Sequence, residues 1–203
     1  MRFGINILFA LFVVLPVVPV RAQSGDNSDL SREYKIKAAF LYNFIQFVDW
    51  PEEKTSNQKE PIILGIIGKD PFGESFEPID NKQIKGRKSL INRFESMDKL
   101  KASGDKEKFY IESMRKCHLL FICSSEKDHL TDILNIVSGH GVLTVGETPE
   151  MLKSGGVINF LVVENKVRFE INLAAAKQDK LKVRSQLLRL ATRVLPGNDP
   201  KKE

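Results

Sequence analysis

Residues 34–51, YKIKAAFLYNFIQFVDWP, decide the fold of the chain because they carry two adjoining rows of apolar side chains at helical spacing. Taken as an α-helix of 100° per residue, the stretch places its first row on one narrow stripe, the pattern of a core-facing helix surface. The first row is Tyr34, Ala38, Leu41, Ile45 and Val48. The second row is Ile36, Phe40, Phe44 and Phe47. Together they widen the apolar arc to roughly 200°, against roughly 100° for an ordinary surface helix.

Two interpretations of this helix stay open. In the first, the helix is sandwiched inside one core and both rows are covered by the protein itself. In the second, the first row meets the protein's own sheet and the second row docks a partner subunit or a target. The helix is predicted to end at Trp50-Pro51, because proline disfavours the α conformation of the residue before it.

The amino-terminal segment, from Met1 to Ala22, has the pattern of a secretory signal peptide. Arg2 supplies a positive start, positions 7–20 form an apolar run, and Val20-Arg21-Ala22 provides a small-x-small ending. The run is interrupted by two prolines and is shorter than the roughly 18 to 20 residues needed to span a bilayer. We therefore predict cleavage after Ala22 and a periplasmic protein without a membrane span.

Cleavage after Ala22 leaves positions 23–203, and the loss of Arg2 and Arg21 lowers the formal net charge from +5 to +3. A mature chain of this length fits one domain that needs no disulfide to be stable. We expect a flexible segment over residues 23–30, the folded domain over 31–195 and a flexible tail over 196–203. Basic and acidic residues are interspersed, which argues against nucleic-acid binding.

Short apolar runs alternate with helical patterns beyond the first helix, which is typical of a single α/β domain with a mixed, mostly parallel sheet flanked by helices. The predicted strands are 62–67, 88–94, 119–123, 142–145, 160–163 and 167–171, the last two forming a hairpin. Helices are predicted over 126–138, from Thr148-Pro149, and from Ser185 to Val194. Residues 99–108 are expected to be a charged, solvated segment.

Five blocks, taken in order, resemble one family. They are KAAFLYNFIQFVDWP (37–51), LGIIGKDPFG (64–73), CHLLFICSSE (117–126), GVLTVGETPEML (141–152) and VRFEINLAAAKQDKLKVRSQLLRLA (167–191). The chain is similar to the YfiR family of bacterial periplasmic regulatory proteins from about Tyr34 to Val194. The resemblance implies a compact, usually dimeric α/β domain without catalytic activity. It also implies that the protein binds the periplasmic sensor domain of a membrane diguanylate cyclase and lowers cyclic-di-GMP production. Other members occur beside different signalling or outer-membrane partners.

The two cysteines depart from the family pattern. Cys117 matches a family position, but the partner that the resemblance implies on the first strand is absent from residues 62–67, and a second family pair is missing. If residues 117–123 form one strand, Cys117 and Cys123 are separated by roughly 20 Å, beyond the roughly 7 Å limit for a disulfide. We predict two buried, free thiols.

No motif predicts catalysis or a cofactor. Gly65, Gly68 and Lys69 miss the spacing of a phosphate-binding loop, and we interpret Gly68 to Gly73 as a turn that leaves the first strand. His118, His129 and His140 recur every eleven residues but fall on a strand, a helix and a turn, so we expect no metal site. We therefore expect neither an enzyme nor a metal or cofactor.

Two functions from different classes remain. The first is a regulator that docks on a diguanylate cyclase or histidine kinase of the inner membrane, with Ile36, Phe40, Phe44 and Phe47 as the docking surface and Lys182 and Arg184 as charged rim contacts. The second is a sensor of a small ligand, acting with a histidine kinase or an outer-membrane system, with a pocket lined by Phe40, Phe44 or Trp50. A homodimer is expected in either case.

Overall fold

The strand of residues 62–67 organises the molecule, because its side chains are apolar on both faces and both faces are covered. The computed structural model describes residues 25–57 and 59–197, and the predicted signal peptide lies outside them. The strand, β2 (Ile62–Ile67), directs Ile62, Leu64 and Ile66 into one core and Ile67 into another, as the alternation of a strand requires.

Eight strands form one mixed sheet in the order β10-β8-β7-β6-β5-β2-β4-β3. Five of the seven ladders are parallel; β7 with β8 and β3 with β4 are antiparallel. Besides β2, its strands are β3 (Gln83–Ile84), β4 (Arg87–Phe94), β5 (Leu119–Ile122), β6 (Leu143–Gly146), β7 (Ile158–Val163), β8 (Lys166–Asn172) and β10 (Arg193–Leu195). A separate two-stranded ribbon pairs β1 (Val48–Asp49) with β9 (Lys182–Val183).

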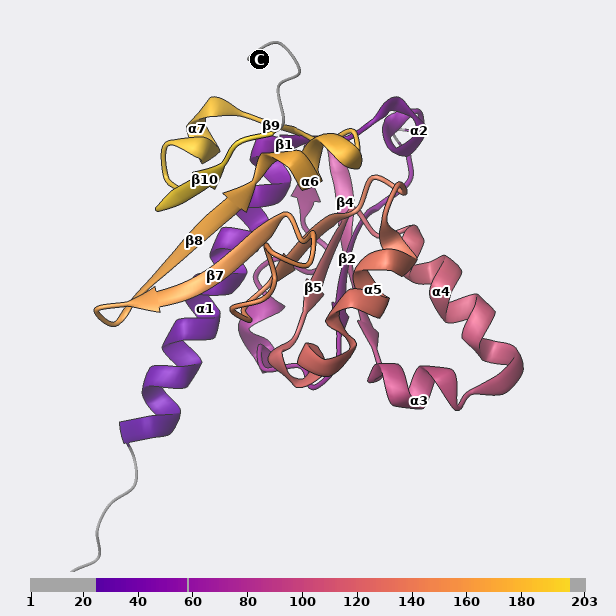
Figure 1. Ribbon diagram of the computed structural model, residues 1–203, viewed down its shortest axis with the longest axis horizontal. Helices are drawn as coiled ribbons and strands as arrows, with labels where there is room; N and C mark the ends of the chain where they lie inside the picture. The colour runs from indigo at the N-terminus through magenta and orange to yellow at the C-terminus, as the bar shows by residue number, and fades with distance from the viewer. Residues whose placement is uncertain (1–24, 58, 198–203) are drawn as a thin grey trace, which may run out of the picture.

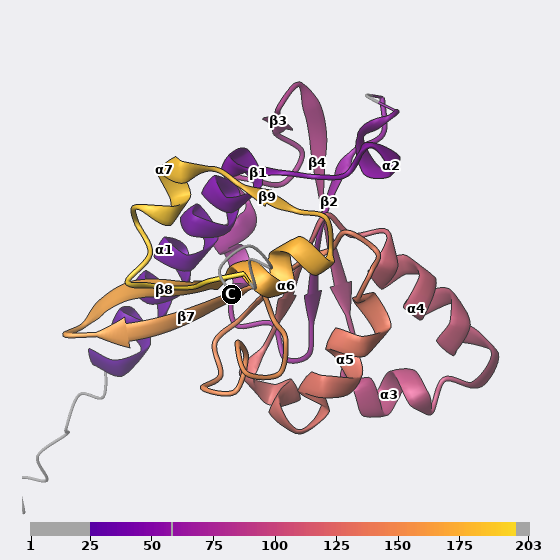
Figure 2. The same cartoon turned by 45° about the horizontal axis from the view of Figure 1, so that its top comes forward.

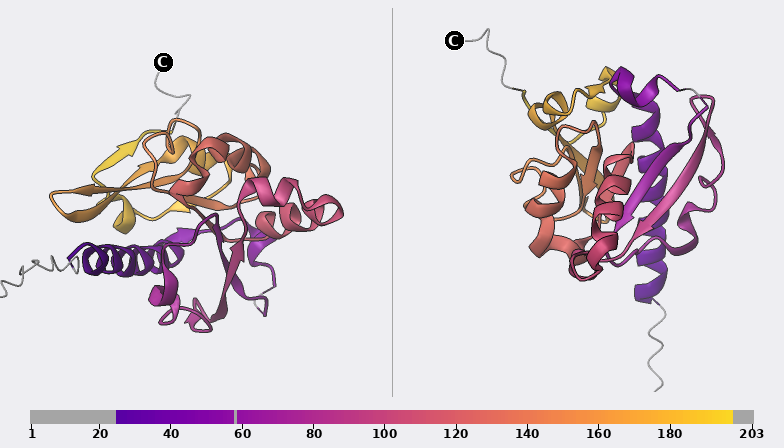
Figure 3. Two further views of the ribbon diagram at one scale, coloured as in Figure 1. Left: turned by 90° about the horizontal axis from the view of Figure 1, so that it is seen from below. Right: turned by 90° about the vertical axis from the view of Figure 1, so that its right-hand side faces the viewer.

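The α-helices lie on both faces of the sheet (Figures 1 and 3). They are α1 (Gly25–Phe47), α2 (Glu52–Thr55), α3 (Met97–Lys101), α4 (Glu107–Arg115), α5 (Leu130–Val137), α6 (Leu173–Gln178) and α7 (Ser185–Leu188). Three short 3₁₀ segments are η1 (Gly73–Phe76), η2 (Gly104–Lys106) and η3 (Ser124–His129). One core packs α1 against β2, β5 and the β7–β8 hairpin, and the other packs α3, α4 and α5 against the opposite face.

The amino-terminal part of α1 and the tip of the β7–β8 hairpin project on the same side of the molecule (Figures 1 and 2). The hairpin turns at Glu164 and Asn165, which both have positive φ angles of 50° and 58°. This is the geometry of a tight hairpin turn that matches the twist of its strands. The hairpin predicted from the sequence is confirmed.

The predicted α/β class with a mixed, mostly parallel sheet is confirmed, and three local predictions need correction. Helix α1 begins at Gly25, so residues 25–30, which we expected to be flexible, are helical. Residues 148–155 form turns instead of the helix predicted from Thr148-Pro149. Residues 97–115 contain α3, η2 and α4, and the charged stretch 99–108 within them is mostly exposed, as predicted.

The third correction concerns the end of the described chain. The helix predicted from Ser185 to Val194 stops after one turn at Leu188, and the chain then joins the sheet as β10 beside β8. The edge of β8 offers unpaired backbone groups, and satisfying them outweighs continuation of a short helix. Among residues 25–57 and 59–197, none of the helices is long and apolar enough to cross a membrane.

Candidate interaction site

The second apolar row of α1 is divided between the core and the surface. Ile36 is 38% exposed, Phe40 and Phe47 are half-buried, and Phe44 is fully buried. The expectation that Phe44 belongs to a docking surface is therefore wrong, because its ring is enclosed by the protein itself.

The enclosure comes from the β7–β8 hairpin. The ring of Phe44 lies 5.5 Å from that of Phe160 and 5.0 Å from that of Phe169, centroid to centroid. The ring of Phe40 lies 6.0 Å and 5.4 Å from the same two rings. Aromatic pairs at these distances stabilise a core beyond their simple burial. The hairpin thus covers much of the second row, as the sandwiched interpretation of the helix expects.

The apolar face of α1 continues past the edge of the body. Leu30 lies about three turns before the buried Leu41 on the same helix face, yet Leu30 is 53% exposed. On the hairpin, Val162 lies on the same face of β7 as Phe160, which contacts α1, and it is 50% exposed. We call Leu30, Ile36, Phe40 and Val162 the α1–β7 surface.

A shallow groove of about 350 Å³ runs along α1 beside this surface. It is lined by Arg32, Lys35, Ile36, Ala39, Phe40 and Asn43. Arg32 and Lys35 are exposed, and neither forms an ion pair with an acid among the described residues. The apolar side chains of the groove are therefore bordered by two unpaired cations.

A buried ion pair fixes α1 on the carboxyl end of the sheet. The Nζ atom of Lys37, which is 3% exposed, lies 2.7 Å from an Oε atom of Glu147 directly after β6, and it also contacts Glu33. The hydroxyl of Tyr34 donates to Glu147 across 3.2 Å. Burial of this hydroxyl and the nearby Glu147 carboxylate raise the pKa of Tyr34. These contacts set the direction in which the amino-terminal part of α1 projects.

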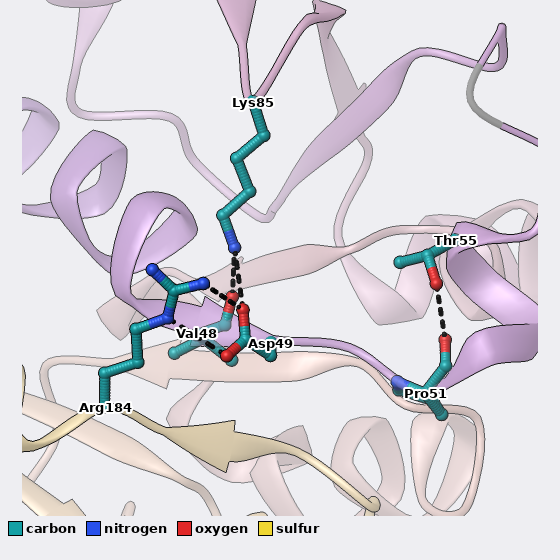
Figure 4. Close-up of polar contacts among 6 residues, drawn as sticks. All are labelled: Val48, Asp49, Pro51, Thr55, Lys85 and Arg184. Carbon is teal, nitrogen blue, oxygen red and sulfur yellow. Dashed lines mark hydrogen bonds and ion pairs between the residues drawn. The ribbon is translucent and has the colours of Figure 1, made fainter.

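At the other end of α1, Asp49 joins three segments that are far apart in the sequence (Figure 4). The guanidinium of Arg184 donates to both carboxylate oxygens of Asp49 at 2.7 and 3.0 Å. Lys85, in the β3–β4 turn, donates to the Val48 carbonyl at 2.5 Å and lies 3.3 Å from Asp49. The hydrogen bonds from Arg184 and the charge of Lys85 lower the pKa of Asp49. We call Asp49, Lys85 and Arg184 the Asp49 cluster.

The two predicted rim cations therefore differ in their surroundings. Arg184 is bound to Asp49 and holds the β1–β9 ribbon, whereas Lys182 on β9 is exposed and forms no ion pair with a described acid. Both residues lie at the Trp50 end of α1, away from the projecting end that carries Leu30 and Ile36. The structure does not bring Lys182 and Arg184 together with Ile36 in one surface.

A cavity of about 620 Å³ opens at the amino-terminal ends of the parallel strands. Its walls come from α2, α4, the turn around His140 and the loop after α6. Neither Phe40 nor Phe44 lines it, and Trp50 adjoins it through an indole N–H that donates to the His118 carbonyl at 2.9 Å. Phe44 lines neither this cavity nor the groove along α1, whereas Phe40 lines the groove. The small-ligand pocket expected at these rings stays a prediction.

Cys117 and Cys123 lie before and after β5 and face different cores. Both sulfur atoms are unbridged and buried. Burial raises the pKa of the Cys117 thiol to about 12 and raises that of Cys123 as well. Their state in the isolated protein stays a prediction, which a thiol assay tests.

The three histidines lie in unrelated surroundings. His118 is buried, and its Nδ1 accepts a hydrogen bond from the Ile63 amide at 3.2 Å. His129 faces Asp98 at 3.0 Å, and His140 is exposed in the turn after α5. Gly68 and Gly73 have positive φ angles of 98° and 50°, as expected for a turn that leaves β2. Within the described parts of the chain, no cluster of His, Cys, Asp and Glu has the arrangement of a metal site.

Several site residues were missed by the sequence analysis, among them Lys54, Glu147, Lys85 and Val162. The first three are charged residues in turns or at element ends, where charge normally means solvation, so the sequence held no signal for them. Val162 was identifiable as part of a strand but not as exposed.

The fold and the site define an α/β domain with an apolar projecting surface, a buried ion pair behind it and a polar cluster at the opposite end. Solved structures share this fold at low identity. One is a conserved domain protein of Vibrio cholerae biovar El Tor, with a TM-score of 0.52 and 8% identity over 79% of this chain. Another is an ABC domain in complex with L-Trp from Streptococcus pneumoniae, with a TM-score of 0.53 and 10% identity over 78% of this chain. The alignments cover 60% of each of those chains, and no curated protein sequence matches this one.

The family of the chain is established by its sequence. The model of the YfiR/HmsC-like family matches residues 34–192, so the protein belongs to that family.

Proposed function

We propose that this protein binds the periplasmic domain of an inner-membrane diguanylate cyclase and represses it, thereby lowering cyclic-di-GMP. Family membership supports the signalling system, and the α1–β7 surface supports the mode of action. The protein is proposed to reach the periplasm by cleavage of its signal peptide near Ala22.

The observation that carries the proposal is the concentration of exposed apolar side chains at one end. Six large apolar residues are exposed among the described residues, and three of them, Leu30, Ile36 and Val162, belong to the α1–β7 surface. Covering the exposed half of such a side chain contributes roughly 1 kcal/mol. Rigid, clustered apolar contacts of this kind are typical anchors of a protein interface.

The charges beside the surface favour an acidic partner. Arg32 and Lys35 border the groove along α1 and are free of acids among the described residues. Opposite charges at the rim of an interface accelerate association and fix orientation. The expected binding region of the cyclase is therefore an apolar patch or helix bordered by Asp and Glu.

We also propose to test whether two copies of the protein form a homodimer through the α1–β7 surface. The mass of the purified protein by light scattering gives the oligomeric state directly. If the dimer uses the α1–β7 surface, then Ile36→Asp converts it to a monomer; if Ile36→Asp stays dimeric, the dimer is formed elsewhere and the surface is free for the cyclase.

The decisive experiment measures binding of the purified protein to the purified periplasmic domain of a diguanylate cyclase from the same host. Ile36→Asp and Val162→Asp are expected to weaken binding at least tenfold and to raise cyclic-di-GMP in cells. Val163→Asp is the matched control, because Val163 is similarly exposed but lies on the opposite face of β7. Equal binding by Ile36→Asp, Val162→Asp and wild type contradicts the proposed surface.

Phe40→Asp is less suited to this test than substitutions at the exposed positions. The Phe40 ring contacts three other rings, those of Phe44, Phe160 and Phe169. Removal of a ring packed in this way costs roughly 2 to 4 kcal/mol. A loss of binding in Phe40→Asp therefore combines lost stability with lost contact, which the exposed positions avoid.

A further inference from the structure

We infer that the cavity at the amino-terminal ends of β2, β5 and β6 binds a small organic carboxylate, and that the ammonium group of Lys54 holds its carboxylate. The inference stands apart from partner binding and is tested without the partner.

The cavity has the size of a ligand site, and its largely charged lining includes one apolar patch. Its volume of about 620 Å³ lies within the roughly 300 to 1,000 Å³ of small-molecule sites. Pro51, Pro61 and Ile63 supply apolar lining, and the backbone of Gly139 and Gly141 supplies a wall without side chains. The compact apolar part of a ligand fits the patch formed by Pro51, Pro61 and Ile63.

Lys54 is the cation best placed to receive a carboxylate. Its side chain is largely buried, and its Nζ atom donates to the carbonyl of Arg115 at 2.8 Å and to the carbonyl of Cys117. An ammonium group has three N–H donors, so one remains without a partner among the described residues. Burial lowers the pKa of Lys54 to about 8, which still leaves most of this group charged at neutral pH.

A second buried cation stands behind the first. Arg87 is 5% exposed, and its guanidinium donates to the carbonyls of Glu60 at 2.6 Å, Pro61 at 3.3 Å and Lys54 at 3.4 Å. All of these acceptors are neutral. Neither Arg87 nor Lys54 forms an ion pair with an acid among the described residues, although Glu60 and Asp179 act on them at longer range.

His118 does not change the charge of the cavity. Burial, with Lys54 and Arg87 close by, lowers its pKa to about 3, so the imidazole is neutral. Its Nδ1 is occupied by the Ile63 amide, and its Nε2 lies 3.2 Å from the Arg87 guanidinium. The ring therefore leaves the positive charge of the cavity floor uncancelled.

The acids that line the cavity have partners of their own. Glu53 faces Lys180 at 3.5 Å, and Glu112 faces Arg115 at 2.8 Å. Asp179 accepts a hydrogen bond from the Gly139 amide at 2.6 Å, and Glu60 accepts one from the Asn57 side chain at 3.1 Å. Neutral amide donors do not cancel the formal charges of Glu60 and Asp179, but Lys54, Lys116 and Arg87 together exceed these two acids by one charge. In a partly desolvated site this positive charge favours an anion.

The chemistry favours a carboxylate over a phosphate. The Arg87 fork is occupied by three carbonyls and cannot clamp phosphate oxygens, so Lys54 offers a single donor to the ligand. One donor near the apolar patch of Pro51, Pro61 and Ile63 suits a carboxylate with one apolar substituent.

Fluorescence of Trp50 offers a direct test, because it is the only tryptophan of the chain and its ring lies 5.8 Å from the His118 ring. The purified protein is titrated with sodium phenylacetate and sodium phenylpropionate, and with phenylacetamide as the uncharged isostere. We expect saturable binding of a carboxylate, at least tenfold weaker binding of the amide, and at least tenfold loss in Lys54→Met. Lys182→Met, an exposed lysine outside the cavity, is expected to bind like wild type.

Circular dichroism first establishes that Lys54→Met folds. If it does not, Ile63→Phe replaces it, because the larger side chain occupies the cavity without removing either cation. No saturable binding of the two carboxylates, equal binding of acid and amide, or unchanged affinity in the folded cavity variant overturns the inference.

Discussion

Gly65 on β2 lies directly against the sulfur of Cys117. A Cβ atom placed on Gly65 would be 2.8 Å from Cys117 Sγ, 2.8 Å from Leu120 Cδ1 and 3.0 Å from Phe94 Cε2. The position on β2 that faces Cys117 is therefore occupied by glycine, the residue type without a Cβ atom, which leaves room for the Cys117 sulfur. The family resemblance implies a cysteine on this strand, and the geometry identifies Gly65 as its position.

Gly65→Cys is expected to form a disulfide with Cys117 under oxidising conditions, because the two sulfur-bearing positions are already within bridging reach. Mass spectrometry should show the loss of two hydrogens on oxidation. Alkylation should then modify one thiol of the variant instead of three. Gly65→Ala is the matched control, since it introduces the same crowding without a sulfur. We expect reduced Gly65→Cys and Gly65→Ala to melt below wild type, and only oxidised Gly65→Cys to recover. A variant that retains three thiols after oxidation contradicts the assigned position.

Both native cysteines are expected to be unreactive until the protein unfolds. Cys117 is 0% and Cys123 1% exposed, and burial raises the pKa of both thiols, so little thiolate forms at neutral pH. A disulfide-exchange reagent should titrate no thiols in the native protein and two per chain in denaturant without reductant. Detection of no thiols in denaturant would contradict the prediction that both cysteines are free.

We expect removal of one partner of the Lys37–Glu147 ion pair to destabilise the fold more than apolar replacement of both partners. Lys37 and Glu147 have side chains that are 4% and 8% exposed, so removing one leaves the other desolvated. Single substitutions that break a buried pair cost roughly 3 to 5 kcal/mol, whereas apolar replacement of both is far less costly. We expect Lys37→Met and Glu147→Leu each to lower the free energy of unfolding strongly, and the double variant to recover much of it.

Urea unfolding of the four proteins forms a double-mutant cycle for this pair. Because Glu33 also contacts Lys37, the loss in Glu147→Leu should be the smaller of the two. Additive losses in the double variant would show that Lys37 and Glu147 do not interact in solution.

The sequence predicted those parts of the fold that depend on local pattern. The apolar run of 62–67 and the alternation around the 164–165 turn are strong signals, and both elements occur as predicted. What failed depends on residues far apart in the chain. The second row of α1 gave no indication that Phe160 and Phe169 cover Phe44, because that contact spans more than a hundred positions.

The cavity around Lys54 shows the same limit. Its lining comes from several separate segments, and a lysine in a polar stretch normally indicates a solvated surface. Only the packing of α2 over the strand ends buries its side chain, and only that burial gives Lys54 a proposed role.

The Asp49 cluster is expected to contribute stability that depends on pH. Hydrogen bonds from Arg184 and the charge of Lys85 lower the pKa of Asp49 below the ordinary aspartate value of about 3.9. A group with a depressed pKa in the folded state stabilises the fold above its unfolded pKa and loses that contribution as the pH falls through the folded value. Asp49→Asn should therefore lower the urea midpoint slightly at pH 6, and the difference from wild type should shrink below about pH 4.

Because the Asp49 side chain is 42% exposed, 1 M salt should also reduce the difference. Adding Arg184→Gln to Asp49→Asn should cost little more, because the interaction is already lost. A midpoint difference that is the same at pH 6 and pH 3 would mean that Arg184 and Asp49 do not pair in solution.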